Sequence, residues 1–251
     1  MIKIRASAAR GQADHGWLVA RHSFSFGDYV DPNEMGWGVL RVINEDRVAP
    51  GKGFATHAHR DMEIITYVLA GSLEHRDSLG NGAVITPGEV QRMSAGSGIR
   101  HSEFNPSANE ATHLLQIWIE PNQHGIAPSY EQRTLSPGQQ QWRLLASADA
   151  EQGSVLIHQD VRLWAACLMP GTAKPLNYTL SAQRLAYVHL VRGRALLNGI
   201  ELNSGDGAKI TAESLLSFSL PETQAAPGAE ALTTGTEILL FDLPATPGDT
   251  A

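Results

Sequence analysis

The feature that most restricts the fold of this chain is a succession of short apolar or alternating runs, each bounded by turn residues. Examples are EIITYVLAG from Glu63, THLLQIWIE from Thr112 and LAYVHLVRG from Leu185. Runs of this length and spacing are typical of β-strands. The pair Asn198-Gly199, between ALL and IEL, predicts a two-residue hairpin because both residues tolerate a positive φ. No useful length of sequence has helical periodicity, so we predict an all-β fold.

Composition narrows the function classes. The chain has 251 residues, 24 Gly, 13 Pro and a net charge of −7. An acidic chain does not attract polyanions, so we expect no nucleic-acid partner. No run approaches the roughly 18 apolar residues of a membrane span, and the first residues lack a signal-peptide pattern, so we expect no membrane partner and a cytoplasmic location. The single cysteine, Cys167, excludes an intramolecular disulfide.

A faint internal repeat predicts two domains. ITYVLAG, ending at Gly71, resembles AYVHLVRG, ending at Gly193. The segment 125–141 is rich in Pro, Gly, Ser and Gln, which is typical of a connection. We therefore predict two copies of one β-domain, residues 1–134 and 135–251, in a chain that we expect to be a monomer.

Two short motifs predict a metal site. His57-Ala58-His59 places two imidazoles on one face of a strand, because alternate residues of a strand share a face. His101-Ser102-Glu103 does the same with an imidazole and a carboxylate. If the two strands are neighbours, the four side chains converge on one point, and three imidazoles with one carboxylate suit a first-row divalent ion. Spacing alone does not decide whether Glu103 or Glu63 is the carboxylate ligand.

The context of these motifs resembles a known family. Gly51, His57, His59 and Glu63 have the spacing of the first cupin motif, and Gly98, His101 and Asn105 that of the end of the second. Gly96 stands where cupins usually have proline, and Gly88 lies two residues early. HAHRDMEIITYVLAGSLEHRDSLGN, MSAGSGIRHSEFNP, SFSFGDYVDP and QIWIEP closely resemble the pirin family, and within it the bacterial pirin-like quercetin 2,3-dioxygenases. The match is dense over residues 15–135.

The resemblance implies a bicupin, two antiparallel jelly-roll-like β-barrels in one chain. In pirins the carboxylate ligand lies two residues after the third histidine, which implies Glu103 here and leaves Glu63 beside the ligands, orienting a histidine NH. Counting from the repeat places Thr179, Ser181, Phe218 and Leu220 at the corresponding positions of the second domain. These residues make no metal site, so we expect one ion per chain. The other histidines, including His22 and His75, are interpreted as structural.

The resemblance also implies a metal-dependent dioxygenase that cleaves the heterocyclic ring of flavonols such as quercetin with O2 and releases CO. Glu103 is then our candidate for the general base. Iron is the expected metal, with Mn, Co, Ni, Cu and Zn as alternatives. The candidates to line the cavity are apolar: Phe26, Met35, Trp37, Phe54, Ile65, Met93, Phe104 and Trp118. The alternative function is a metal-dependent regulatory pirin that binds a protein partner without significant turnover.

Overall fold

The computed structural model describes residues 1–172, 174–222 and 235–245. These residues form strands and two short 3-10 helices, η1 (Ser7–Ala9) and η2 (Glu151–Gly153), which confirms the all-β prediction. Neither helix is long and apolar enough to cross a membrane. The chain divides into two compact units. The first unit is residues 10–136 and 144–161, and the second is residues 1–9, 137–143 and 162–251.

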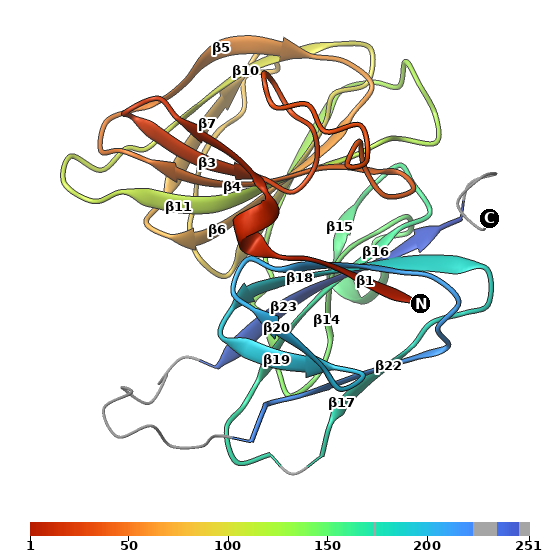
Figure 1. Cartoon of the computed structure of the whole chain (residues 1–251). Coiled ribbons are helices and arrows are strands. Elements are labelled where there is room, and N and C mark those ends of the chain that lie inside the picture. Colours follow the sequence, from red (N-terminus) through yellow and green to blue (C-terminus); the bar gives the residue numbers. More distant parts are fainter. Residues whose placement is uncertain (173, 223–234, 246–251) are drawn as a thin grey trace. The chain divides into compact units, whose positions relative to one another are not determined.

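The first unit has a seven-stranded and a four-stranded antiparallel sheet (Figure 1). The larger sheet runs, in spatial order, β12 (Ser129–Thr134), β9 (Glu89–Ser94), β6 (Glu63–Ala70), β11 (Thr112–Ile119), β4 (Leu40–Val48), β3 (Leu18–His22) and β2 (Gly11–Asp14). The smaller runs β5 (Gly53–His59), β10 (Ile99–Phe104), β7 (Leu73–Asp77) and β8 (Gly82–Ile85). Leu18 and Val68 of the larger sheet pack in one cluster with Leu73 of the smaller. The two sheets therefore enclose a common interior.

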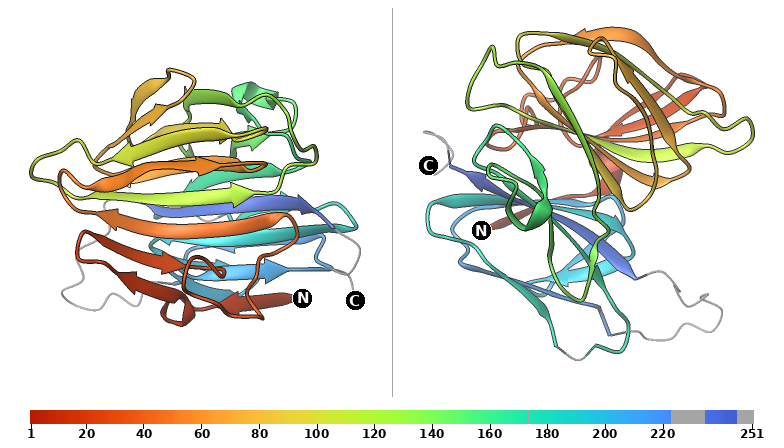
Figure 2. Two further views of the ribbon diagram at one scale, coloured as in Figure 1. Left: turned by 90° about the horizontal axis from the view of Figure 1, so that it is seen from above. Right: turned by 180° about the vertical axis from the view of Figure 1, so that it is seen from behind.

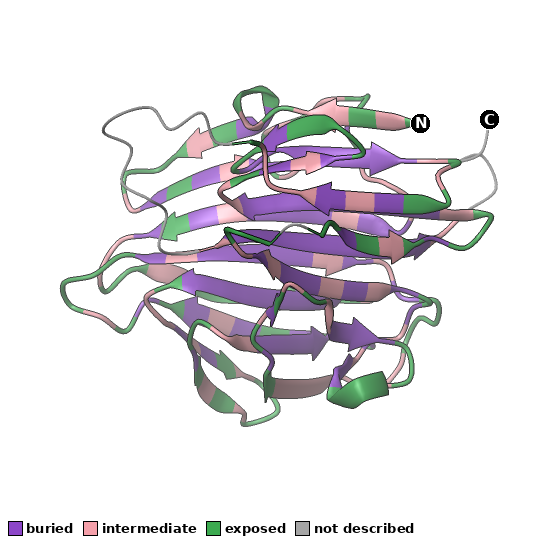
Figure 3. Cartoon of the chain, turned by 90° about the horizontal axis from the view of Figure 1, so that it is seen from below, coloured by how far each residue is buried: buried purple, intermediate pink, exposed green. Residues whose placement is uncertain are grey.

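The second unit repeats this design. Its larger sheet runs β1 (Ile2–Arg5), β21 (Gly207–Ile210), β18 (Arg184–Arg192), β23 (Thr236–Pro244) and β16 (Arg162–Leu168), with β13 (Gly138–Gln139) parallel to β16. Its smaller sheet runs β17 (Leu176–Thr179), β22 (Leu215–Ser219), β19 (Arg194–Leu197) and β20 (Ile200–Asn203). Two short strands, β14 (Arg143–Ser147) and β15 (Val155–Leu156), pair in parallel and belong, apart from Arg143, to the first unit. Figure 2 gives two further views of these strands, and Figure 3 shows buried residues concentrated on them.

The predicted hairpin is confirmed. Leu197 of β19 pairs with Ile200 of β20, and the two residues between them, Asn198 and Gly199, have φ of 47° and 82°. A positive φ at both central positions is what a turn of this kind requires.

The internal repeat corresponds to equivalent strands. β6 pairs with β9 and β11, and β18 pairs with β21 and β23. Each of β6 and β18 is followed by a glycine with positive φ, Gly71 (72°) and Gly193 (86°). A side chain at Gly71 would meet Thr112 and its preceding carbonyl, and one at Gly193 would meet Thr236, the first residue of β23. The same close approach explains the same glycine in both copies.

The interiors of the two units differ in polarity. Leu176 and Phe218 pair across β17 and β22 and belong to one large apolar cluster. Within the described residues, both groups of His, Asp and Glu close enough to hold a metal ion lie in the first unit. The second unit therefore has an apolar core where the first has its candidate metal centre.

Candidate metal centre

The four predicted ligands lie on two neighbouring strands. β5 and β10 pair antiparallel, with His101 opposite His57 and Ile99 opposite His59. A register shift between His101 and Glu103 brings Glu103 opposite Phe54. The pairing of β5 with β10, which the sequence could only assume, places the three imidazoles on one face of the smaller sheet.

The three imidazoles form a tight cluster. Their ring centroids are 4.5 Å apart for His57 and His101, 4.7 Å for His57 and His59, and 4.8 Å for His59 and His101. One nitrogen from each ring lies within 4.8 Å of the other two. Nε2 of His57 is 3.0 Å from Nε2 of His101. Two nitrogens about 2.1 Å from a common ion and at right angles to each other would be about 3.0 Å apart.

Their protonation suits metal binding. His57 Nδ1 lies 2.8 Å from the carbonyl oxygen of Ala55, an acceptor, so the proton belongs on Nδ1 and the Nε2 lone pair faces the cluster. Burial and the neighbouring His57 lower the pKa of His59 to about 4. Burial, with His57 and His59 adding to it, lowers the pKa of His101 to about 2. Both rings are therefore neutral at pH 7, as ligands must be.

Glu103 is buried and held by Gln116. The Gln116 amide Nε2 donates to both carboxylate oxygens, at 3.1 and 3.0 Å, and Thr66 Oγ1 donates at 3.4 Å. Burial raises the pKa of Glu103, and the Gln116 hydrogen bonds oppose that rise. A carboxylate oxygen of Glu103 lies within 4.8 Å of nitrogens of His101 and His75, which form a second candidate group.

His101 is linked to a buried chain of hydrogen bonds through His75 to Asp77, which we call the relay. Nδ1 of His101 is 3.4 Å from Nδ1 of His75, whose Nε2 is 3.2 Å from Oδ2 of Asp77. Gln91 Nε2 also donates to His75 Nδ1, at 3.1 Å. Asp77 accepts the His75 Nε2 proton, so His75 Nδ1 is an acceptor and His101 donates to it. His101 Nε2 is thus left free for a metal.

Asp77 is held in its charged form. Burial alone would raise the pKa of the Asp77 carboxyl, but hydrogen bonds from Asn81, His75 and Leu79 outweigh it and lower that pKa. The side chains of Asp77 and His75 are both fully buried. The relay therefore ends on a fixed negative charge.

A cavity of about 80 Å³ opens beside the cluster. Its wall includes His57, His59 and Glu103 as well as aromatic side chains, among them Trp118. The remaining lining residues are Leu18, Ala20, His22, Phe26, Asn44, Asp46, Phe54 and Gln116. The cavity thus combines metal-ligand atoms, aromatic walls and a polar patch from β3 and β4.

These residues fit a divalent metal ion. Two unprotonated Nε2 atoms 3.0 Å apart repel each other unless a cation or a proton lies between them. The depressed pKa values of His59 and His101 disfavour the proton. Three imidazoles with a nearby carboxylate are a donor set for several first-row metals.

Comparison with known proteins identifies the family. Residues 3–119 match the family model described as Pirin, and residues 144–243 match that of the quercetinase C-terminal cupin domain. The chain belongs to the pirin family. It is 44% identical over 244 residues to a quercetin 2,3-dioxygenase of Escherichia coli K12, covering 97% of this chain and 99% of that one. It is 45% identical over 215 residues to a pirin-like protein of Caulobacter vibrioides, covering 84% and 91%.

A solved pirin has the same fold. The bacterial pirin YhhW of Escherichia coli, in complex with nickel(II), superposes with a TM-score of 0.88 at 43% identity, covering 98% of this chain and 100% of that one. The predicted bicupin fold and pirin membership are therefore confirmed. A divalent metal is consistent with the nickel complex of this relative and with the imidazole cluster of this pirin.

Glu63 lies away from the imidazole cluster. Thr66 of β6 faces Glu103, so Glu63, an odd number of positions earlier, faces the other side of the sheet. Its Oε2 accepts from Ser94 Oγ at 2.9 Å and from the His158 backbone N at 3.2 Å. Among the residues that the structure describes, the imidazole in contact with the Glu63 carboxylate is that of His158, so we do not assign Glu63 a role at the metal.

The predicted cavity residues divide into two groups. Phe26, Phe54 and Trp118 line the cavity. Met35 and Phe104 are outside it, with 55% and 37% of their surfaces exposed. Ile65, Met93 and Trp37 are also outside it; Ile65 faces the same side of β6 as Glu63, and Met93 packs with Ile64 in a separate cluster. Conversely, sequence reasoning missed Asn44, Asp46 and Gln116, and it interpreted His22 and His75 as structural.

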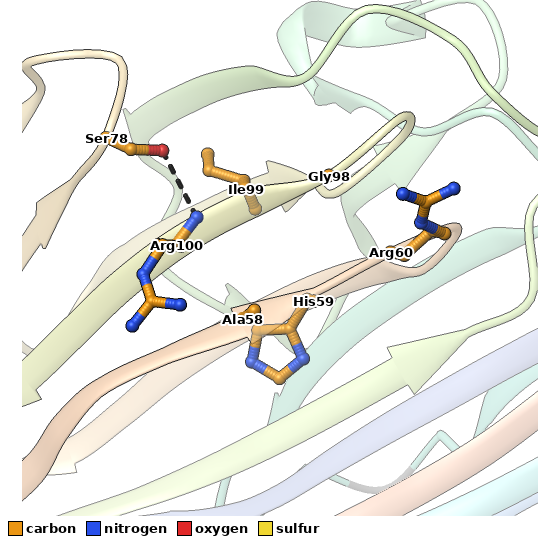
Figure 4. A pocket seen from close by; sticks show the side chains of 7 residues that line it. All are labelled: Ala58, His59, Arg60, Ser78, Gly98, Ile99 and Arg100. Atoms are coloured by element: carbon orange, nitrogen blue, oxygen red, sulfur yellow. Dashed lines mark hydrogen bonds between the residues drawn. The ribbon is translucent and has the colours of Figure 1, made fainter.

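A groove of about 360 Å³ also borders the cluster (Figure 4). It is lined by Ala58, His59, Arg60, Ser78, Gly98, Ile99 and Arg100. Arg100 of β10 donates its backbone N–H to Ser78 Oγ at 3.1 Å. His59 lines both the groove and the cavity, so one metal-ligand candidate of this pirin borders both spaces.

We predict that Asp77→Asn weakens metal binding about 10- to 100-fold, because it removes the carboxylate that fixes the tautomer of His75 and through it the ring of His101. The measurement is Ni²⁺ affinity by chelator competition. Glu74→Gln, on the same strand and paired with the exposed Arg76, is the matched control and should leave affinity unchanged. Equal Ni²⁺ affinity for Asp77→Asn and the parent chain would show that the relay does not support the ligand.

Proposed function

We propose that this chain is a metal-dependent dioxygenase that cleaves the heterocyclic ring of flavonols such as quercetin with O2 and releases CO. The observation that carries the proposal is the imidazole cluster opening into a cavity with aromatic walls. Relatives with this name match over nearly the full chain. A flat aromatic substrate with several oxygens suits such a lining.

We propose His57, His59, His101 and Glu103 as the ligands and iron as the native metal. The metal supplies Lewis acidity that lowers the pKa of the flavonol 3-hydroxyl and fixes its oxygen in place. The donor set accepts several metals, and a nickel complex is known for a relative, so loading with a metal series is part of the test.

The side chains of this chain exclude water, orient the substrate and move a proton. Phe26, Phe54 and Trp118 give the substrate an apolar wall. Glu103, held by Gln116, accepts the proton of the 3-hydroxyl, so the substrate O–H bond breaks and a carboxyl O–H bond forms. The cavity of about 80 Å³ is smaller than the roughly 300 Å³ or more of ordinary ligand pockets. Phe26, in the loop between β3 and β4, is the wall residue that we expect to move for a flavonol.

Glu103→Gln is expected to lower quercetin turnover about 100-fold or more, since a positioned general base contributes at least that much. The amide keeps an oxygen ligand, so metal content should fall far less than turnover. The measurements are O2 uptake, CO release and elemental analysis of the same samples. Glu110→Gln, an exposed carboxylate in the loop before β11, is the control and should behave like the parent. Unchanged turnover in Glu103→Gln would remove Glu103 from the role of base.

The discriminating experiment for the function is O2 uptake and CO release with quercetin across proteins loaded with Fe, Mn, Co, Ni, Cu or Zn. Turnover above that of the free metal supports the dioxygenase. No turnover with any loaded metal, together with a protein partner that binds only the metal-loaded chain, would instead support the regulatory function.

A further inference from the structure

Asp46 is a buried carboxylate in the wall of the cavity. It lies on β4 between β3 and β11, opposite Ala20 and Leu114, and only 5% of its surface is exposed. Val48, two residues on, belongs to the interior cluster, so Asp46 faces the interior. It therefore lines the same cavity as the metal-ligand candidates His57 and His59.

Its carboxylate lacks the partners that such burial usually requires. Within the described residues, Oδ1 of Asp46 has no hydrogen-bond partner, and no arginine, lysine or histidine forms an ion pair with the carboxylate. The charges that act on it are those of Glu103 and Glu45; burial first, then these two carboxylates, raise the pKa of Asp46 to about 7. Buried polar atoms in proteins nearly always have a hydrogen-bond partner. We therefore expect Oδ1 of Asp46 to accept a hydrogen bond from a donor outside the described residues.

Three other polar side chains of the wall, those of His22, Asn44 and Gln116, already have partners. His22 Nδ1 and Asn44 Oδ1 hydrogen-bond to each other at 2.8 Å, and Gln116 donates to Glu103. Trp118, which also lines the cavity, has an indole Nε1 that is buried and has no acceptor within the described residues. Two of the residues that line the cavity thus carry a buried polar atom without a partner, an acceptor on Asp46 and a donor on Trp118.

We propose that Asp46 binds a second hydroxyl group of the substrate, apart from the one held at the metal, and so selects polyhydroxylated aromatic molecules. An aromatic hydroxyl of the substrate donates its proton to the Asp46 carboxylate, which accepts it. A site built around a hydroxyl rejects an analogue that lacks it, because the buried polar atoms then stay unsatisfied. This inference rests on the proposed function for its choice of ligand.

Two flavonols test it. Quercetin carries hydroxyls besides that at position 3, whereas 3-hydroxyflavone carries that one alone. With the metal-loaded full chain, we expect kcat/KM and affinity, measured by quenching of tryptophan fluorescence, to favour quercetin about tenfold. Asp46→Asn and Asp46→Leu should each bring the ratio of kcat/KM for quercetin to that for 3-hydroxyflavone close to one. The change should come mainly from a higher KM for quercetin. Asp14→Asn, an exposed carboxylate of β2, should leave the preference unchanged.

The outcomes separate this inference from the proposed function. If neither flavonol is turned over but quercetin binds more tightly and the variants lose that difference, Asp46 selects hydroxyls and the dioxygenase proposal fails. If the parent chain does not discriminate, or if the folded Asp46→Asn variant keeps the full preference, the inference is overturned and a bound water is the partner of Asp46. A loss of affinity that is equal for both flavonols also overturns it. Thermal unfolding of each variant establishes that it is folded. If Asp46→Leu does not fold, the test uses Asp46→Asn alone, because asparagine keeps the shape of the aspartate side chain.

Discussion

His101→Ala is expected to weaken metal binding more than 100-fold and, with it, to lower any metal-dependent turnover. His101 is central to the cluster: its Nε2 lies 3.0 Å from that of His57, and its Nδ1 contacts His75. A structural metal held by four protein ligands is bound with about 10 to 16 kcal/mol, or roughly 3 kcal/mol per ligand. Losing one ligand should therefore weaken binding more than 100-fold. Calorimetric titration with Ni²⁺ and elemental analysis of the purified protein measure this loss.

The control for this prediction is His124→Ala, which removes an exposed imidazole of the same unit. It should bind Ni²⁺ as the parent does. His101→Ala should remain folded, because β10 is held by backbone pairing with β5 and β7. A folded His101→Ala variant that binds Ni²⁺ as tightly as the parent would contradict the metal centre.

The imidazole cluster could be predicted because its geometry is largely local. His57 and His59 share a face by strand alternation alone, as do His101 and Glu103. The one non-local assumption was that β5 and β10 are neighbours, and the resemblance to pirins supplied it. The hairpin at Asn198-Gly199 was predictable for the same reason, since the backbone preference belongs to the two residues themselves.

The polar interior could not be predicted, because alternation does not say which face is inside. On β4, Asn44 and Asp46 alternate with Glu45 and Arg47, and both faces of the strand read as polar. The structure turns Asn44 and Asp46 inward because Val48, on the same face, packs in the interior cluster. On β7, His75 shares its face with the buried Leu73, a signal that could have placed His75 inside.

The pairing of strands that are far apart in the chain could not be predicted from the sequence either. β1, at the start of the chain, pairs with β21, so Ile2 lies opposite Ile210. Glu63 lies one position from Ile64, and that single step puts it on the other face of β6. A motif spacing fixes the distance along a chain, but the face of a strand depends on which neighbour it packs against.

Gly53→Ala is expected to lower both the stability of the chain and its affinity for a metal ion, although Gly53 is not itself a candidate ligand. A Cβ at Gly53 would lie 2.2 Å from the carbonyl oxygen of Glu103 and 2.5 Å from Cα of Phe104. Both are backbone atoms, so neither can rotate away, and β5 and β10 must separate where the register shift sets the position of Glu103. Overpacking of this kind costs about 1 to 3 kcal/mol of the free energy of unfolding. Because His57 and His59 lie on the displaced strand, we expect Ni²⁺ affinity to fall as well, by about tenfold or more.

Gly82→Ala is the matched control for Gly53→Ala. Gly82 begins β8 in the same sheet, and a Cβ there meets nothing within 4 Å. Chemical denaturation and Ni²⁺ titration of both variants separate the steric effect from the general effect of replacing a strand glycine. Gly82→Ala should match or slightly exceed the parent in stability, since alanine has less backbone entropy to lose on folding. If both variants had the parent's stability and Ni²⁺ affinity, the close approach of β5 and β10 would not be what positions the ligands.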